Sequence, residues 1–332
     1  ATESADFLLA GNETESLNIL EEDSGEAEGV RYVMVDYQLG FAGTTKYNAP
    51  ASFESRHDIE VTEQRTVPEL GTTVYNPQNR QRLYSVHTQR AYESMRVRLY
   101  QHHGSAVEPA RFVTRFGEYN PELGIATPPE DGQLAEFYNT SEAASEAAEQ
   151  DPNVVHGGVL GQPSERIEAL EHFRLVHASE AGARSPFERA TGQQTQPESW
   201  VKTFERVDGA TIQGTGPANA EVQAQVEMKI PSTGETFVYK QFAQTDENGN
   251  FEMTVPYSTT DYEEYGTEAG YTNVSVRANG SYQFIAFGEG DLVAWTGDAD
   301  VTEGQVLGED DSAVSVELEQ RDEVNTADGS EN

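Results

Sequence analysis

Hydrophobic and polar positions along the first 180 or so residues switch between strand-like and helix-like patterns. The run 30–36 is nearly continuously apolar and ends in Asp36, which is typical of a buried strand. Residues 79–103 place their apolar positions at helical spacing and stop at Gly104, which predicts a helix. Two further helices and a strand are predicted, in that order, at 132–150, 164–170 and 173–177.

The pattern changes after residues 179–199, which are rich in Gly, Gln, Ser and Pro and therefore predict a linker. Beyond it, short β-rich runs are separated by Pro, Gly and Asn, as in a small β-sandwich. The dipeptide Asn248-Gly249 predicts a tight hairpin turn between Phe242 and Phe251. The predicted strands are 211–214, 221–230, 236–241, 251–255, 274–277 and 314–318.

These patterns predict an α+β protein with two domains, which suits a length of 332 residues. A mixed α/β core domain is expected over 1–198. An all-β sandwich of prealbumin-like or immunoglobulin-like topology is expected over 199–320. Residues 321–332 are expected to form a disordered acidic tail.

Charge narrows the class of protein further, because 58 acidic residues stand against 21 basic ones, for a net charge of −37. The acids are spread over the whole chain, which favours a salt-adapted globular protein over an acidic disordered one. A nucleic-acid partner is excluded, since no basic cluster could meet a phosphate backbone. The lysines are Lys46, Lys202, Lys229 and Lys240.

Other features limit the compartment and the chemistry. The absence of cysteine excludes disulfides and thiolate metal sites. No stretch is long and apolar enough to cross a bilayer, and the polar start shows no signal peptide. The chain is therefore expected to be either cytoplasmic or a soluble region of a longer protein that has its own membrane anchor.

No motif in the sequence identifies a metal site or a catalytic nucleophile. His102 and His103 are adjacent, so on a helix they point about 100° apart and do not readily share a metal. Residues 246–251 begin like a calcium loop, but Phe251 and Tyr257 stand where Gly and Glu are required. No GxSxG or phosphate-binding loop occurs, and pairs of acids mean little in so acidic a chain.

Two polar features remain. Asp36 follows the strand and Lys46 lies in the loop after it, so the pair could orient a polar ligand; a salt bridge that fastens the loop is the alternative. Four N-x-S/T sequons would permit glycosylation of an exported chain, at Asn12, Asn139, Asn273 and Asn279.

Several strings in order resemble the C-terminal soluble region of the haloarchaeal oligosaccharyltransferase catalytic subunit, a dolichyl-phospho-oligosaccharide–protein glycotransferase. The resemblance extends from near Ala5 to about Phe287. Its strings are 5–10, 30–36, 94–100, 172–177, 201–207 and 256–260.

The resemblance implies a membrane transferase that moves a glycan from a lipid carrier to the Asn of N-x-S/T acceptor polypeptides. It implies that this region lies on the extracellular side and helps to hold the acceptor. The divalent metal (Mn or Mg), the catalytic carboxylates and most of the lipid-linked oligosaccharide site would lie in a membrane domain outside this chain. The family's WWDYG motif is absent here, so the isolated chain is expected to be inactive.

The family also has an Asp and a Lys on a segment that follows the strand, and Asp36 and Lys46 are the matching positions. The match departs from the family's spacing, because the loop 37–45 separates the two residues, and Pro50 stands where Met or Ile is expected. A longer loop can still return its end to the same place. Two rivals remain, a non-catalytic surface or binding module of a halophile and a self-contained hydrolase that uses two of the many acids.

The charge imbalance predicts that the fold needs salt. Repulsion among surface carboxylates should unfold the chain in dilute buffer, whereas molar KCl shortens the Debye length to about 3 Å and screens it. Circular dichroism during thermal unfolding at low and molar KCl checks this. Equal stability in both would show that the acidity is not a salt adaptation.

Overall fold

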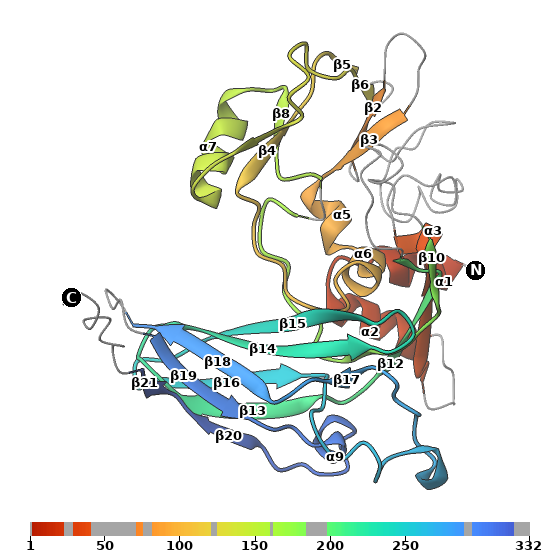
Figure 1. Ribbon diagram of the computed structural model, residues 1–332, viewed down its shortest axis with the longest axis vertical. Helices are drawn as coiled ribbons and strands as arrows, with labels where there is room; N and C mark the ends of the chain where they lie inside the picture. The colour runs from red at the N-terminus through yellow and green to blue at the C-terminus, as the bar shows by residue number, and fades with distance from the viewer. Residues whose placement is uncertain are drawn as a thin grey trace, which may run out of the picture. The chain divides into compact units, whose positions relative to one another are not determined.

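The computed structural model describes residues 2–22, 29–40, 71–75, 82–120, 125–159, 162–183, 198–288 and 294–321. It consists of two compact units, Ala1–Arg206 and Val207–Asn332 (Figure 1). Both units mix strands with helices, and most strand pairs are antiparallel. The predicted α+β class is confirmed.

The first unit holds short helices and four small sheets in its described part. One sheet has the order β1-β12-β9, a second β3-β2-β6-β5 and a third β7-β4-β8, while β10 and β11 form a pair. Its helices are α1 (Thr2–Leu9), α2 (Glu13–Glu22), α3 (Tyr37–Gly40), α5 (Gln89–Glu93), α6 (Met95–Tyr100) and α7 (Ser141–Gln150). Its strands are β1 (Tyr32–Asp36), β2 (Gly71–Tyr75), β3 (Arg82–His87), β4 (Phe112–Arg115), β5 (Tyr119–Asn120), β6 (Ile125–Ala126), β7 (Ala135–Phe137), β8 (Val154–His156), β9 (Phe173–Ala178), β10 (Ala181–Ala183), β11 (Glu198–Ser199) and β12 (Val201–Arg206).

The sheet β1-β12-β9 is the part of this unit that carries the site described below. Strand β12 is central and pairs antiparallel with both neighbours, with Val33 opposite Phe204 and Lys202 opposite Ala178. Val35, Phe204 and Leu175 are fully buried, and α6 packs against β1. The predicted strands at 30–36 and 173–177 are present as β1 and β9.

Two of the predicted helices are only partly formed. Residues 82–87 of the expected helix 79–103 are instead strand β3, which pairs with β2, because sheet pairing outweighs an ambiguous apolar pattern. Two short helices follow, separated by the extended residue Ser94 (ψ 137°). The helix expected over 132–150 begins only at Ser141, where Thr140 caps it by accepting the Ala143 N–H at 3.2 Å.

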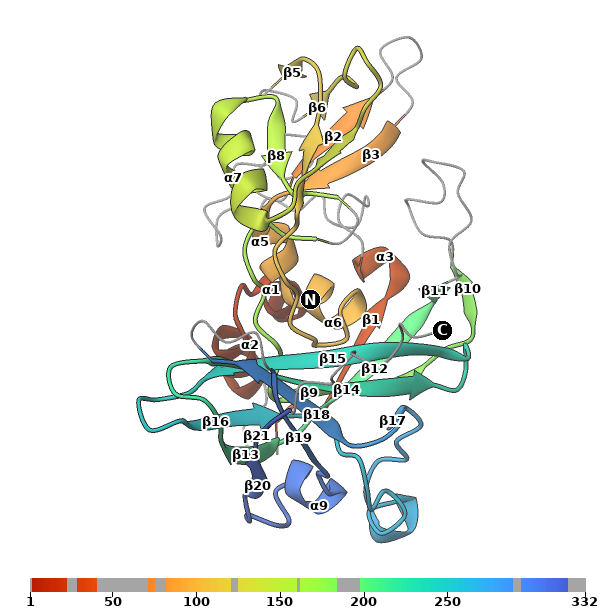
Figure 2. The ribbon, with the colours of Figure 1, turned by 60° about the vertical axis from the view of Figure 1, so that its left-hand side comes forward.

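The short helix expected at 164–170 does not form. Ile167 instead makes an antiparallel bridge with Val107, and its backbone N–H and carbonyl are both used in that bridge. Helix α7 packs on the neighbouring strands β4 and β8 (Figure 2).

The second unit is a β-sandwich, as the sequence predicts. One sheet has the order β16-β13-β20 and the other β15-β14-β18-β19-β21, with β17 also on β14 (Figures 1 and 2). Apolar side chains fill the space between them, and the Phe251 and Phe284 ring centroids lie 6.2 Å apart. Its elements are β13 (Ala210–Thr215), β14 (Glu221–Ile230), β15 (Glu235–Gln244), β16 (Asn250–Val255), η3 (Thr267–Ala269), β17 (Arg277–Ala278), β18 (Tyr282–Phe287), β19 (Ala294–Ala299), α9 (Glu303–Val306), β20 (Val314–Glu317) and β21 (Glu319–Gln320).

The turn at Asn248-Gly249 is present but joins strands of different sheets, so it is not a hairpin. Asp246 organises it, because its carboxylate accepts the N–H groups of Asn248 and Asn250, both at 2.8 Å. Gly249 takes a φ of 83°, which favours glycine.

The boundary between the units falls after Arg206, beyond the expected position at 198. Strand β12 carries the chain past that position, because it completes the sheet with β1 and β9. Lys202 therefore belongs to the first unit. Most of the expected linker (184–197) and the expected tail from 322 onward lie outside the described residues.

A buried ion pair holds β9 to β12 in the first unit. The Arg174 and Glu205 side chains are about 1% and 0% exposed, with Nη2 and Oε2 2.9 Å apart, and Arg31 also meets Glu205 at 2.9 Å. Arg174→Met should lower the free energy of unfolding by about 3 kcal/mol, since it leaves a buried carboxylate short of a partner. Denaturant unfolding in molar KCl measures this.

The matched control is Arg115→Met, which removes a more exposed pair with Asp131 and should cost under about 1 kcal/mol. Equal losses in the two variants would mean that burial of the Arg174 pair does not matter.

Candidate functional site

The site predicted from the sequence starts where β1 ends. Asp36, the last residue of β1, is half-buried and lies opposite Val201 of β12. Its Oδ1 accepts the backbone N–H of Leu39 at 2.8 Å, so the carboxylate caps the first turn of α3. The described role of Asp36 is therefore to start the helix that leads into the next segment.

Lys46 and Pro50 lie outside the described residues, in the segment 41–70. The pairing of Asp36 with Lys46 thus stays a prediction. The structure does describe helix α3, from which that segment leaves, and the residues that hold this helix in place.

The start of helix α3 is held by Trp200, the residue that directly precedes strand β12. The Tyr37 N–H donates to the Trp200 carbonyl at 2.8 Å. The Tyr37 ring lies edge-on to two aromatic rings, with centroids 5.7 Å from Trp200 and 6.4 Å from Tyr100. These contacts fix the direction in which the chain leaves the sheet.

The end of α3 is held by α6. A Cβ on Gly40 would lie 2.2 Å from Cγ of Tyr100, so only glycine lets the helix approach that ring. The Gln101 side-chain amide donates to the Gly40 carbonyl at 2.8 Å. The point from which residues 41–70 depart is thereby anchored.

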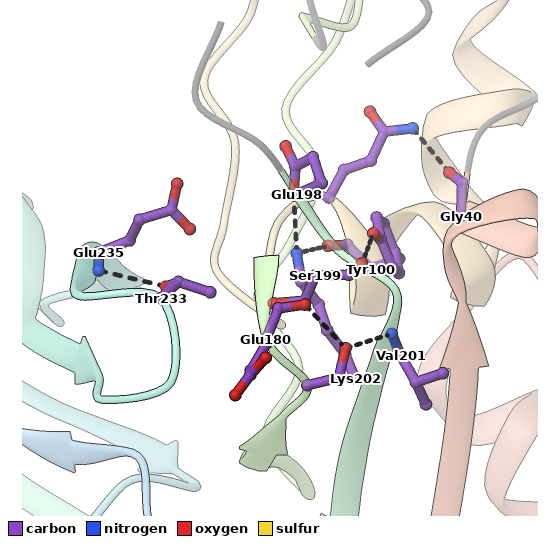
Figure 3. A network of polar contacts seen from close by, with 11 residues as sticks. Gly40, Tyr100, Glu180, Glu198, Ser199, Val201, Lys202, Thr233 and Glu235 are labelled. Carbon is purple, nitrogen blue, oxygen red and sulfur yellow. Dashed lines mark hydrogen bonds and ion pairs between the residues drawn. The ribbon is translucent and has the colours of Figure 1, made fainter. Parts of the chain in front are cut away.

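Lys202 supports α3 indirectly, through Tyr100, and the sequence alone does not identify it as a site residue. Its Nζ donates to the Tyr100 carbonyl at 2.8 Å, lies 4.2 Å from the Tyr100 ring centroid, and pairs with Glu198 at 3.3 Å. Figure 3 shows Tyr100, Ser199 and Lys202 lying together, and the Tyr100 hydroxyl donates to the Ser199 carbonyl. A buried ammonium with these partners fixes the Tyr100 ring against which α3 rests.

Two histidines, His102 and His103, follow shortly after α6. Burial, and then the nearby charges of Lys202 and Arg98, lower the pKa of His102 to about 4. Burial also lowers the pKa of His103 well below its ordinary value. Both rings are therefore neutral at pH 7. Among the described residues no three His, Asp or Glu side chains gather as a metal site, so this part of the chain offers no fit for a divalent ion.

Comparisons with known proteins extend over nearly the whole chain. The family model "Archaeal glycosylation protein B long peripheral domain" matches residues 209–310. Over 358 aligned residues the chain is 39% identical to the dolichyl-monophosphooligosaccharide–protein glycotransferase AglB of Haloferax volcanii, covering 97% of this chain. The chain is therefore similar to the C-terminal part of an AglB.

The match covers 33% of the Haloferax volcanii AglB, so the chain spans about a third of that relative, in its C-terminal part. Two crystal structures of the Archaeoglobus fulgidus oligosaccharyltransferase have the same fold at 18% identity. One was solved with Zn and sulfate (TM-score 0.50, 95% of this chain, 36% of that one). The other is tethered to an acceptor peptide containing the NVT sequon (TM-score 0.51, 95% and 34%).

The match to AglB confirms the resemblance carried by strings such as 30–36 and 172–177. The first of these strings delivers Asp36, and the second forms most of β9. In the described part of the chain no helix is long and apolar enough to span a membrane.

The lowered pKa of His102 predicts acid sensitivity. The unfolded chain binds a proton at His102 near the ordinary pKa of 6.5, whereas the folded chain resists it until about pH 4. Stability should therefore fall as pH drops from 6.5 towards 4, and His102→Gln should flatten part of that slope. Denaturant unfolding across this pH range in molar KCl measures it.

The exposed His177 supplies the control, because His177→Gln should keep the original slope. An unchanged slope in His102→Gln would show that the folded protein accommodates a charged His102.

Proposed function

We propose that the chain is the extracellular region of a membrane oligosaccharyltransferase that transfers a lipid-linked glycan to the Asn of N-x-S/T acceptor polypeptides. The observation that carries this is the 39% identity to the Haloferax volcanii glycotransferase over 97% of this chain. So continuous a match favours a transferase region over a surface module or a separate hydrolase.

The contribution proposed for this region is acceptor binding through the segment that leaves α3. Support comes from the anchoring of both ends of α3, at Tyr37 by Trp200 and at Gly40 by Tyr100 and Gln101. A segment that recognises a small group gains affinity when its root is fixed, since less conformational entropy is lost on binding.

Lys46 is the proposed contact to the acceptor, together with Asp36 at the root of the segment. The Ser or Thr hydroxyl of a sequon is small, so it must be read by hydrogen bonds. A site built to bond a hydroxyl strongly rejects an analogue that lacks one. An ammonium group supplies such donors, and the Asp36 carboxylate already fixes the helix before it.

The remaining parts of the enzyme are assigned outside this chain. The divalent metal (Mn or Mg), the lipid-linked oligosaccharide site and the membrane anchor would belong to the rest of the full-length protein. The catalytic residues would lie there as well, and the described residues of this chain do not fit a divalent ion. The isolated chain is accordingly proposed to be inactive.

The test is Lys46→Ala in the full-length enzyme. Loss of the hydroxyl contact should reduce transfer to an N-x-T peptide by about ten-fold or more, through weaker peptide binding. Thermal unfolding should be unchanged. Transfer is measured with lipid-linked glycan as donor and a labelled peptide as acceptor.

The matched control is Lys229→Ala, which removes an exposed lysine of β14 and should leave transfer intact. Unchanged transfer by Lys46→Ala would overturn the role of Lys46. Transfer catalysed by the isolated chain would overturn the assignment of the catalytic groups to the rest of the protein.

A further inference from the structure

The chain itself carries four N-x-S/T sequons, and the described structure treats them differently. We propose that the full-length enzyme glycosylates its own region at Asn273, and that the neighbouring sequon at Asn279 is not used. This inference rests on the proposed function. It adds the enzyme's own chain to the substrates.

The backbone at Asn273 has the form that an acceptor needs. Residues 272–275 belong to no helix or strand, and burial alternates along them: Asn273 is exposed, Val274 is buried, Ser275 is half-buried and Val276 is buried. Alternation of this kind means that Asn273 and Ser275 face the same outer side, as in extended chains. A site that reads an Asn together with the hydroxyl two residues later needs both on one side.

The segment is also fixed from beneath, which keeps Asn273 outward. Val274 is only 5% exposed, and its carbonyl accepts the Arg277 Nε–H at 3.1 Å. Arg277 in turn lies over the Tyr262 ring at 4.9 Å and pairs with Glu263 at 2.7 Å. No hydrogen bond holds the Asn273 side-chain amide among the described residues, so a glycan on it displaces nothing.

The sequon at Asn279 has the same sequence pattern, but its Asn side chain is already hydrogen-bonded. The Asn279 side-chain amide donates to Glu227 Oε1 at 2.6 Å, and its backbone N–H donates to the Glu227 carbonyl at 2.7 Å. The Ser281 hydroxyl donates to Asp300 at 2.7 Å. The nitrogen to be modified therefore already has a partner, whereas the Asn273 side-chain amide has none among the described residues.

The other two sequons run into helices. Asn12 caps α2 by accepting the Glu15 N–H at 2.8 Å, and Thr14 lies within that helix. Ser141 begins α7, directly after the capping residue Thr140. The hydroxyl residue of each of these sequons is therefore held in the first turn of a helix, and neither sequon forms an extended segment.

The reaction is the proposed one with an internal acceptor. The Asn273 Nδ2 bonds to the anomeric carbon of the glycan while the bond from that carbon to the lipid phosphate oxygen breaks. The phosphate leaves with the bonding electron pair, and the amide gives up one proton. The co-reactant is the same lipid-linked glycan that the proposed function requires.

The experiment is mass spectrometry of the full-length protein expressed in a halophilic host that lacks its own copy of the enzyme. Trypsin cuts after Arg277 and so separates the sequons, placing Asn273 in peptide 241–277 and Asn279 in peptide 278–321. An exported reporter protein with an N-x-T sequon is analysed in the same cells.

We expect a glycan mass shift on peptide 241–277 that is lost in Asn273→Gln and kept in Asn279→Gln, with peptide 278–321 unshifted. A glycosylated reporter with an unshifted 241–277 peptide would overturn this inference and leave the proposed function standing. A shift on both peptides would overturn the selection by local structure. An unmodified reporter would count against the proposed function itself.

Discussion

Two charges on strand β12 are removed from water, and the described core of the first unit depends on satisfying both. Lys202 is 3% exposed and Glu205 is 0% exposed. An uncompensated buried charge costs about 3–5 kcal/mol, so a fold that buries two of them must bring their partners into place. Three of those partners come from distant parts of the chain, Arg31, Tyr100 and Arg174, and the fourth, Glu198, lies four residues before Lys202.

The same constraint links the sheet to the proposed acceptor site. Lys202 fixes Tyr100, Tyr100 leaves room for only a glycine at position 40, and α3 is therefore set at one place above the sheet. Asp36 starts that helix from the end of β1. Buried charge and aromatic packing thus hold the start of the segment that is proposed to contact the acceptor.

Sequence reasoning succeeded where one local pattern decided the structure. Strand β14 was predicted at its observed bounds because its burial alternates along ten residues. Reasoning failed where pairing with distant residues decided it, as at β3, and where short strands with weak patterns were passed over, as at β18 and β19. The sequence alone does not identify Lys202 as a site residue, because it predicts a domain boundary at 198 and a lysine on a strand gives no sign of burial. The sequence does contain a signal for strand β12, since 201–207 is one β-rich run. In the structure this strand pairs with β1 of the first unit.

The proposed function depends on a contact between the acceptor and the segment that leaves α3. Photo-cross-linking tests it most directly, with the full-length enzyme and an N-x-T peptide that carries a photoreactive group beside its Thr, followed by mass mapping of the labelled residues. Such a contact predicts label within the first unit, in the stretch that begins at Asp36 and runs through Lys46. Label confined to the β-sandwich, at residues beyond Val207, would contradict it.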